Sequence, residues 1–158
     1  MGKRSGAIAA IVGIGEVPTG KFPERTALEA AAQVSRLAVQ DAGIDKRDID
    51  VIMTTGAIFS RDFNSDLIFG RMVEELGLNG SVHSTMQVMS GGASGSSLTK
   101  TASALVNAGL AKNVLCVHAD KLATGIAIAD AIEVFSSLGI PEDWERPYGQ
   151  HMGSMAAC

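Results

Sequence analysis

The chain has 158 residues, of which 46% are hydrophobic and only 4% aromatic, and its formal net charge is -4. Acidic and basic residues are interspersed without a basic stripe, which argues against nucleic acid as a partner. No apolar stretch reaches the roughly 20 residues that a membrane-spanning helix needs, so we expect no membrane association. A core of aliphatic side chains suits helices packed on a sheet. Two cysteines give no disulfide framework, which favours a cytoplasmic protein.

The first apolar run covers residues 7–14. It is short and continuous, as in a strand that is buried on both faces of a parallel sheet. Gly13-x-Gly15 resembles the start of a dinucleotide-binding loop, but Pro18 occupies the position of the third glycine. We therefore expect a buried first strand and no dinucleotide site.

The next two elements carry clearer local signals. Thr26 and Glu29 form a capping-box pattern, which predicts that a helix begins here. Gly43 is placed to end this helix after Ala42. Residues 49–56 form a second apolar run, which predicts the second strand.

The rest of the chain continues the same alternation. We expect a helix over 66–76, a strand over 82–88, a helix from about 94 to 108 and a strand over 113–118. The order β-α-β-α-β-α-β predicts an α/β fold, a mostly parallel sheet with helices on both of its faces. Residues 1–120 would form this core, and residues 121–158 an incomplete loop or cap segment.

A glycine-rich turn between the third strand and the third helix is the candidate site. It runs from Met89 through Gly91 and Gly92 to Ser94 and Gly95. Such a turn presents backbone N–H groups at a helix N-terminus, which suits an anion or a developing oxyanion. The alternative is that the glycines only allow the strand and the helix to pack closely. Neither the nucleophile-elbow motif nor the phosphate-loop motif is present.

Four other side chains invite a chemical role. His83 is the candidate base nearest in sequence to the hydroxyl of Ser90, although it is also an ordinary strand histidine. His118 follows the last strand, at the end where α/β proteins bind ligands. Cys116 lies within an apolar run, which predicts a buried thiol. No group of histidines, cysteines or carboxylates has metal-ligand spacing, so we expect no metal site.

Five segments carry a family resemblance. They are Ala10-Ile11-Val12-Gly13, Ala38-x-x-Asp41-Ala42-Gly43-Ile44, Ser94-Gly95, Ala108-Gly109 with Val114-Leu115-Cys116-Val117, and Trp144-Glu145-x-Pro147-Tyr148-Gly149. In this order, along nearly the whole chain, they resemble the N-terminal half of the thiolase superfamily. The sterol-carrier-protein-type branch is the most similar. The resemblance implies a thiolase-like N-terminal half as the fold.

The family pattern places a nucleophilic cysteine in Cys-x-Ser-Gly, at the start of the helix after the third strand. Anchoring that pattern on Ser94-Gly95 puts Gly92 at the cysteine position, and Met89 where the family often has asparagine. Glycine has no thiol, so we expect no catalytic residue at this position and no acyl-enzyme. The substrate-binding residues that the resemblance implies are Met89, Gly91, Gly92, Ser94, Gly95, His118 and Tyr148.

The resemblance implies an acyltransferase-type protein of lipid metabolism that makes or breaks a carbon–carbon bond in acyl-CoA thioesters, with the CoA thioester as substrate and no other cofactor. Two alternatives stay open: a retro-aldolase acting on a 3-hydroxyacyl-CoA, and a non-catalytic acyl-CoA-binding or assembly subunit. Family members are homo-oligomers, and relatives in this branch pair with a protein that has an OB-fold and a zinc ribbon. Because only the first half of the family pattern is covered, we expect the catalytic base to lie beyond Cys158.

Overall fold

A computed structural model describes residues 9–56, 68–121, 127, 129–130 and 146–148. The elements, in chain order, are α1 (Ala27–Ala42), the 3-10 helix η1 (Lys46–Asp48), β1 (Val51–Thr54), α2 (Ile68–Leu76), β2 (Ser84–Gln87), α3 (Ser94–Asn107), β3 (Val114–Val117) and the 3-10 helix η3 (Arg146–Tyr148). Helices and strands alternate from α1 to β3, which confirms the predicted α/β class. The start of the helix predicted at 66 and most of residues 121–158 lie outside the described residues.

The three described strands form one parallel sheet in the order β2-β1-β3. Val51 at the start of β1 is in register with Ser84 of β2 on one side and with Val114 of β3 on the other. All four residues of β1 are buried, as expected for a central strand that is covered on both faces. Helix α3 forms the crossover from β2 to β3, and α2 lies in the connection between β1 and β2.

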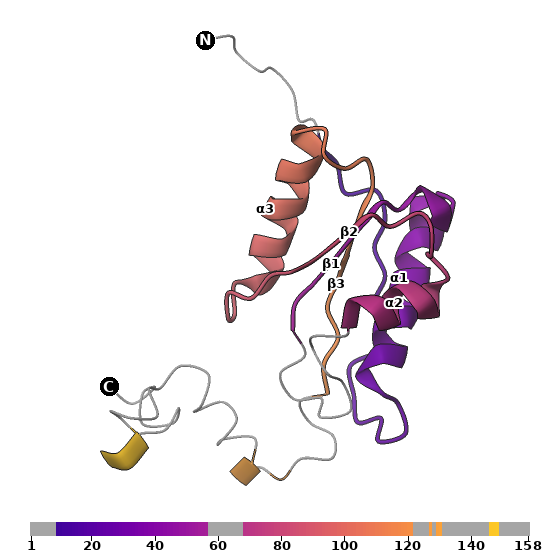
Figure 1. Cartoon of the computed structure of the whole chain (residues 1–158). Coiled ribbons are helices and arrows are strands. Elements are labelled where there is room, and N and C mark those ends of the chain that lie inside the picture. Colours follow the sequence, from indigo (N-terminus) through magenta and orange to yellow (C-terminus); the bar gives the residue numbers. More distant parts are fainter. Residues whose placement is uncertain (1–8, 57–67, 122–126, 128, 131–145, 149–158) are drawn as a thin grey trace.

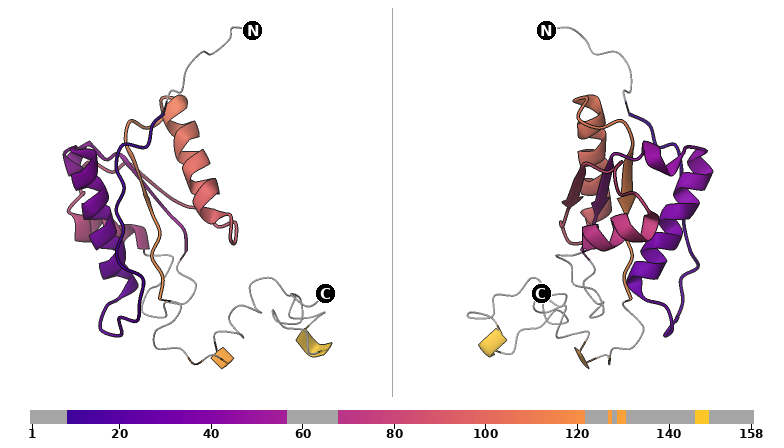
Figure 2. Two further views of the ribbon diagram at one scale, coloured as in Figure 1. Left: turned by 180° about the vertical axis from the view of Figure 1, so that it is seen from behind. Right: turned by 45° about the vertical axis from the view of Figure 1, so that its right-hand side comes forward.

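Helices cover both faces of the sheet, as predicted (Figures 1 and 2). Helices α1 and α2 pack on one face, where Ile52 of β1 meets Met72 and Ala32 in the larger hydrophobic cluster. Helix α3 packs on the other face, where Leu98 joins Val51 and Met53 in a smaller cluster. This division follows from the alternation of side chains along β1, because neighbouring residues point to opposite faces.

Helix α1 begins and ends where its sequence signals place it. The Thr26 Oγ1 atom accepts a hydrogen bond from the Glu29 N–H (3.1 Å), and Glu29 Oε2 accepts one from the Thr26 N–H (2.8 Å). These two bonds satisfy donors that have no partner inside the helix. Gly43 then adopts a left-handed backbone with a φ of 66°, which ends the helix.

The predicted first strand is wrong over the residues that the structure describes. Residues 9–14 are irregular, and Ile11, Val12 and Ile14 are 74%, 61% and 71% exposed. The cause is close backbone contact with α1: an added Cβ on Gly13 would overlap the carbonyl of Ala38 and lie 2.7 Å from the Ala42 Cβ. The glycines thus bring the backbone onto the helix and leave the apolar side chains outside. The described sheet has three strands where four were predicted.

Candidate functional site

The candidate site is the turn that connects β2 to α3, at the carboxyl end of the parallel sheet. Gly91 has a φ of 55°, a left-handed conformation that favours glycine. Two backbone bonds close the turn: the Ala93 N–H donates to the Ser90 carbonyl, and the Ser94 N–H donates to the Gly91 carbonyl (both 3.1 Å). The predicted sequence of strand, glycine turn and helix is therefore confirmed.

The Ser94 hydroxyl is part of this turn. It donates to the Gly91 carbonyl (2.7 Å) and accepts from the Ser90 N–H (2.9 Å). Both bonds are local, and they hold the turn that precedes the helix. Because the hydroxyl already donates its proton to a backbone carbonyl, Ser94 stabilises the turn and is not placed as a nucleophile.

Two backbone N–H groups at the start of α3 face no acceptor. The amides of Gly95 and Ser96 make no hydrogen bond within the described part of the chain. An added Cβ at Gly92 would meet no heavy atom of the described residues within 4 Å, so the space beside this glycine is open among them. Open space before two unpaired donors suits a ligand oxygen that carries negative charge.

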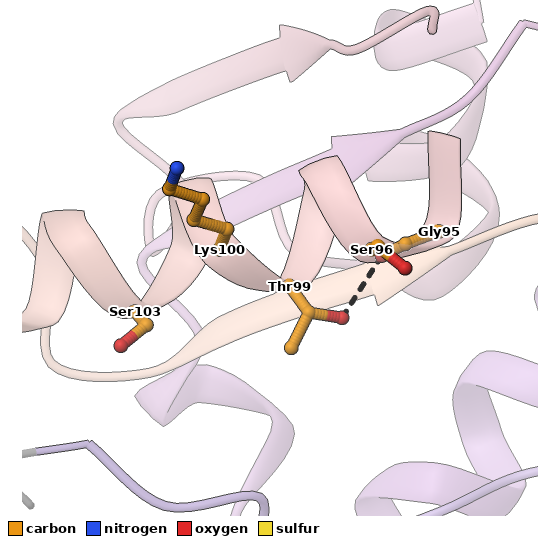
Figure 3. Close-up of a pocket in the computed structure, with 5 residues that line it drawn as sticks. All are labelled: Gly95, Ser96, Thr99, Lys100 and Ser103. Atoms are coloured by element: carbon orange, nitrogen blue, oxygen red, sulfur yellow. Dashed lines mark hydrogen bonds between the residues drawn. The ribbon is translucent and has the colours of Figure 1, made fainter. Parts of the chain in front are cut away.

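A shallow hollow of about 490 Å³ adjoins these amides along the exposed side of α3 (Figure 3). Gly95, Ser96, Thr99, Lys100 and Ser103 line it. The Thr99 hydroxyl donates to the Gly95 carbonyl (3.0 Å), and Lys100 brings a positive charge to the hollow. Together with the helix dipole, this charge favours an anionic ligand here.

Met89 lies between this turn and the central strand. An added Cβ on Gly56, which follows β1, would lie 2.9 Å from the Met89 Sδ atom. The Gln87 amide Nε2 also donates to the same sulfur (3.4 Å). Met89 is 54% exposed, so its side chain presents an apolar surface at the carboxyl end of the sheet.

His118 lies at the same edge of the sheet, directly after β3. Its Nδ1 atom forms a hydrogen bond with the hydroxyl of Thr55, which follows β1 and is only 5% exposed. Sequence reasoning missed Thr55. Each residue could have been noticed, because Thr55 and His118 both stand at the end of an apolar run. Their contact could not be predicted, because it depends on the register between two strands about sixty residues apart.

Two predicted groups lie elsewhere. Tyr148, in η3, is 89% exposed, and Figure 1 shows this element apart from the sheet. His83 lies at the amino end of β2, where its Nε2 atom is 3.9 Å from Asp50 Oδ2. It is therefore at the edge opposite Ser90, and the interpretation of His83 as a base for that hydroxyl is wrong.

The prediction of a buried Cys116 is also wrong, because this residue is exposed. It lies on β3, an outer strand of the described sheet. On this strand Leu115 and Val117 point toward α1 and α2 and are buried, whereas Cys116 points to the opposite face. Neighbouring atoms still withdraw its sulfur from water, and this desolvation raises the pKa of the Cys116 thiol.

No family model and no curated protein matches the chain. The chain does resemble solved structures. It superposes on the Ltp2-ChsH2(DUF35) aldolase with a TM-score of 0.64 at 26% identity, and the match covers 89% of this chain and 33% of the aldolase chain. The 3-oxoacyl-[acyl-carrier-protein] synthase III from Aquifex aeolicus VF5 superposes with a TM-score of 0.56 at 22% identity, over 65% of this chain and 32% of that one. The fold is thiolase-like. This chain spans about a third of each of these structures.

The thiolase-like core thus brings two kinds of group to one edge of its sheet: the backbone donors at the start of α3 and the imidazole of His118. Lys100 lies further along α3, where it lines the hollow on the exposed side of that helix. Among the described residues, no group of three or more histidines, cysteines and carboxylates could hold a metal ion. No helix in the described ranges is long and apolar enough to cross a membrane. The described turn itself carries no thiol.

Proposed function

We propose that the protein containing this chain makes or breaks a carbon–carbon bond in an acyl-CoA thioester, without an acyl-enzyme on a cysteine of this chain. One observation carries the proposal. The start of α3 presents the amides of Gly95 and Ser96, which have no partner among the described residues, to the solvent-exposed turn. The resemblance to the thiolase superfamily would put Gly92 of this turn at the position of the nucleophilic cysteine. The likeness to a synthase and to an aldolase supports this class of chemistry.

The version that fits these groups best is a retro-aldol cleavage of a 3-hydroxyacyl-CoA. A base takes the proton of the 3-hydroxyl group, and the bond between C2 and C3 breaks. The bond's electron pair moves into the thioester, which becomes an enolate, while C3 leaves as an aldehyde or ketone. Protonation at C2 then gives the shortened acyl-CoA, so the reaction needs no oxidant or second substrate. The amides at the start of α3 would hold the enolate oxygen.

The proposal extends to the branch of the family, the oligomeric state and a partner protein. The chain would belong to the sterol-carrier-protein-type branch, with Gly92 at the position of the family cysteine. The whole protein would be a homo-oligomer. It would also work with a partner that has an OB-fold and a zinc ribbon. The Ltp2-ChsH2(DUF35) aldolase is named for two components, which supports the idea of a partner.

The test of the reaction uses the full protein that contains this chain, with any partner that co-purifies. It is incubated with a 3-hydroxyacyl-CoA, the carbonyl product is trapped and measured, and the CoA product is identified by chromatography. We expect an aldehyde or ketone and a shortened acyl-CoA in equal amounts. Intact-mass analysis after incubation with acetyl-CoA should show no acyl adduct. A stable thioester on this chain would contradict the proposal.

Proline at position 96 tests the role of the amides. Ser96→Pro removes one N–H that has no partner inside the helix, in the first turn, where α-helices tolerate proline. Ser96→Ala is the matched control because it removes the hydroxyl and keeps the N–H. If the amide holds the enolate oxygen, Ser96→Pro should lower kcat about 10²- to 10³-fold. The alanine variant should keep its activity, and circular dichroism should show that both variants fold.

A second candidate, a subunit that binds acyl-CoA without turnover, is favoured by one observation. Lys100 and the unpaired amides surround a hollow that suits an anion such as the CoA phosphates, whether or not a reaction follows. Calorimetry with acetyl-CoA would then show binding that Lys100→Ala weakens, in a protein that releases no aldehyde.

A further inference from the structure

Three residues form one row across the carboxyl ends of the strands. Thr54 of β1 is in register with Gln87 of β2 and with Val117 of β3. The residues that follow continue the ladder: the Val88 N–H donates to the Thr54 carbonyl (2.9 Å), and the Thr55 N–H donates to the Val117 carbonyl (3.4 Å). The next row therefore holds Val88, Thr55 and His118.

This row points toward α3. Val51 and Met53 of β1 face α3, and Val88 packs against the same cluster. Side chains alternate along a strand, so Thr55 continues the α3 face of β1. Helix α3 follows β2 directly, which places its N-terminus at the same edge. The imidazole of His118 and the unpaired amides of α3 thus share one edge and one face of the sheet.

The hydrogen bond to Thr55 fixes one side of the His118 ring. In the tautomer that leaves Nε2 free to accept a proton, Nδ1–H donates to the hydroxyl oxygen of this buried threonine. The Thr55 backbone is itself fixed, because its carbonyl accepts from the Thr54 hydroxyl (2.7 Å). Nε2 of His118 makes no hydrogen bond within the described ranges, and the residue is exposed. An imidazole with one nitrogen held by the protein and the other open is arranged for proton transfer.

Resting on the function proposed above, we infer that His118, and not a residue beyond Cys158 as the resemblance implies, is the base of the carbon–carbon cleavage and that Thr55 positions it. Nε2 takes the proton of the substrate 3-hydroxyl as the bond between C2 and C3 breaks. The electron pair goes to the enolate, whose oxygen the α3 amides hold, and the imidazolium returns its proton to C2. One strand separates β2 from β3, so their ends lie about 10 Å apart.

Charged and titratable groups near His118 are few among the described residues. Thr55 and Gly56, at the end of β1, carry no charge. Cys116 precedes His118 by two residues on the same face of β3, and Asp120 follows it by two. The Asp120 carboxylate accepts a hydrogen bond from the Lys121 N–H (2.7 Å). Because both groups can contribute to a pH profile, Cys116→Ser is measured beside the histidine variants.

The kinetic test compares the two described histidines. His118→Gln keeps a polar side chain and removes the base, so kcat for the 3-hydroxyacyl-CoA should fall about 10²- to 10⁴-fold with KM nearly unchanged. The acidic limb of the pH–rate profile should also disappear. His83→Gln, at the opposite edge of the sheet, should leave both unchanged. Equal effects of the two substitutions, or none from His118→Gln, would overturn the assignment.

Thr55 is tested by removing and restoring its hydroxyl. Thr55→Val should lower kcat and shift the pH–rate profile, because the ring of His118 loses its anchor. Thr55→Ser keeps the hydroxyl and should restore both. Loss of activity in both variants would indicate that Thr55 acts only through packing, and would remove it from the mechanism.

A binding measurement separates failure of this inference from failure of the proposed reaction. The His118 imidazole signals are followed by NMR during titration with a 3-hydroxyacyl-CoA and with the matching acyl-CoA that lacks the hydroxyl. We expect the Nε2 signal to move with the hydroxylated ligand only. If the protein releases aldehyde and this signal stays still, the base lies elsewhere. If the signal moves and no aldehyde forms, the proposed reaction is wrong and His118 is a hydroxyl-binding residue.

Discussion

Gly92→Cys should place a thiol at the start of α3 with little effect on stability. An added Cβ meets no heavy atom of the described residues within 4 Å, and the residue is not among those with a left-handed backbone. The change in unfolding free energy should therefore stay within about 0.5 kcal/mol, the usual range for a surface substitution. Gly91→Cys is the contrasting variant. Its φ of 55° is left-handed, so a side chain there should cost about 1–2 kcal/mol.

The assay follows acyl capture in a protein whose Cys116 and Cys158 are replaced by serine. The helix N-terminus should lower the pKa of the introduced thiol at position 92 and make it react faster with an alkylating reagent at neutral pH. With acetyl-CoA, the thiolate would attack the carbonyl carbon and the CoA thiolate would leave. Intact-mass analysis should then show one acetyl group on the Gly92→Cys protein and none on its parent.

Two results would refute this reasoning. One is a folded Gly92→Cys protein that alkylates no faster than a free cysteine and captures no acetyl group. The other is efficient capture by Gly91→Cys in its place. Either result would mean that the thioester carbonyl does not lie in front of Gly92, and the assignment of this turn as the oxyanion site would fail with it.

Four further predictions concern the fold. Thr26→Ala should cost about 1 kcal/mol of unfolding free energy, measured in urea, because it removes the N-cap of α1. The hydrogen bonds from Thr26 hold the pKa of Glu29 below its usual 4.5. The stability that the Glu29 carboxylate contributes is therefore complete above pH 4.5 and is lost as the pH falls through the lower pKa of the folded state. Glu29→Gln should flatten the acid limb of a plot of unfolding free energy against pH. Gly13→Ala should cost about 1–3 kcal/mol or detach its segment from α1, as measured by denaturation and amide exchange, because the new methyl overlaps the Ala38 carbonyl. Ile52→Ala should cost about 2–5 kcal/mol in the same denaturation assay, because this fully buried side chain fills the larger cluster.

Matched variants check three of these, the changes at Thr26, Gly13 and Ile52. Thr26→Ser keeps the capping oxygen and should retain most of the stability. Gly70→Ala has no atom within 4 Å of the new methyl, and it should not destabilise its helix as Gly13→Ala destabilises the α1 contact. Ile52→Val should cost less than Ile52→Ala, in keeping with the smaller volume lost. A Gly13→Ala protein with normal stability and unchanged amide exchange would contradict the close contact.

Local signals explain which elements could be predicted. The cap at Thr26 and the left-handed Gly43 are short-range features, so the limits of α1 follow from the sequence. The apolar runs around β1 and β3 also follow, because strands buried in a parallel sheet need them. Strand β2 carries mostly polar residues and is only partly buried. The segment over 9–14 failed for a physical reason. An apolar run predicts burial, but the glycines at 13 and 15 allow the backbone itself to occupy the inner surface.

The site could be predicted only in part. The turn at Gly91 and the start of α3 are local, and they lie where the glycine pattern places them. The bond between Thr55 and His118 joins residues 63 positions apart and depends on how β1 pairs with β3. No local sequence motif around either residue predicts its contact with the other. The same holds for His83, whose distance from the turn depends on the direction of β2.

The side chain of Asp50, at the amino edge of the sheet, fixes the loop that connects α3 to β3. Its Oδ2 accepts from the Lys112 N–H (2.7 Å) and its Oδ1 from the Asn113 N–H (3.1 Å). This anchoring side chain thus lies at one edge of the sheet, and the groups proposed to react lie at the other. Residues at the carboxyl edge of the sheet could therefore be exchanged to suit a new substrate without loss of the hydrogen bonds that Asp50 makes at the amino edge.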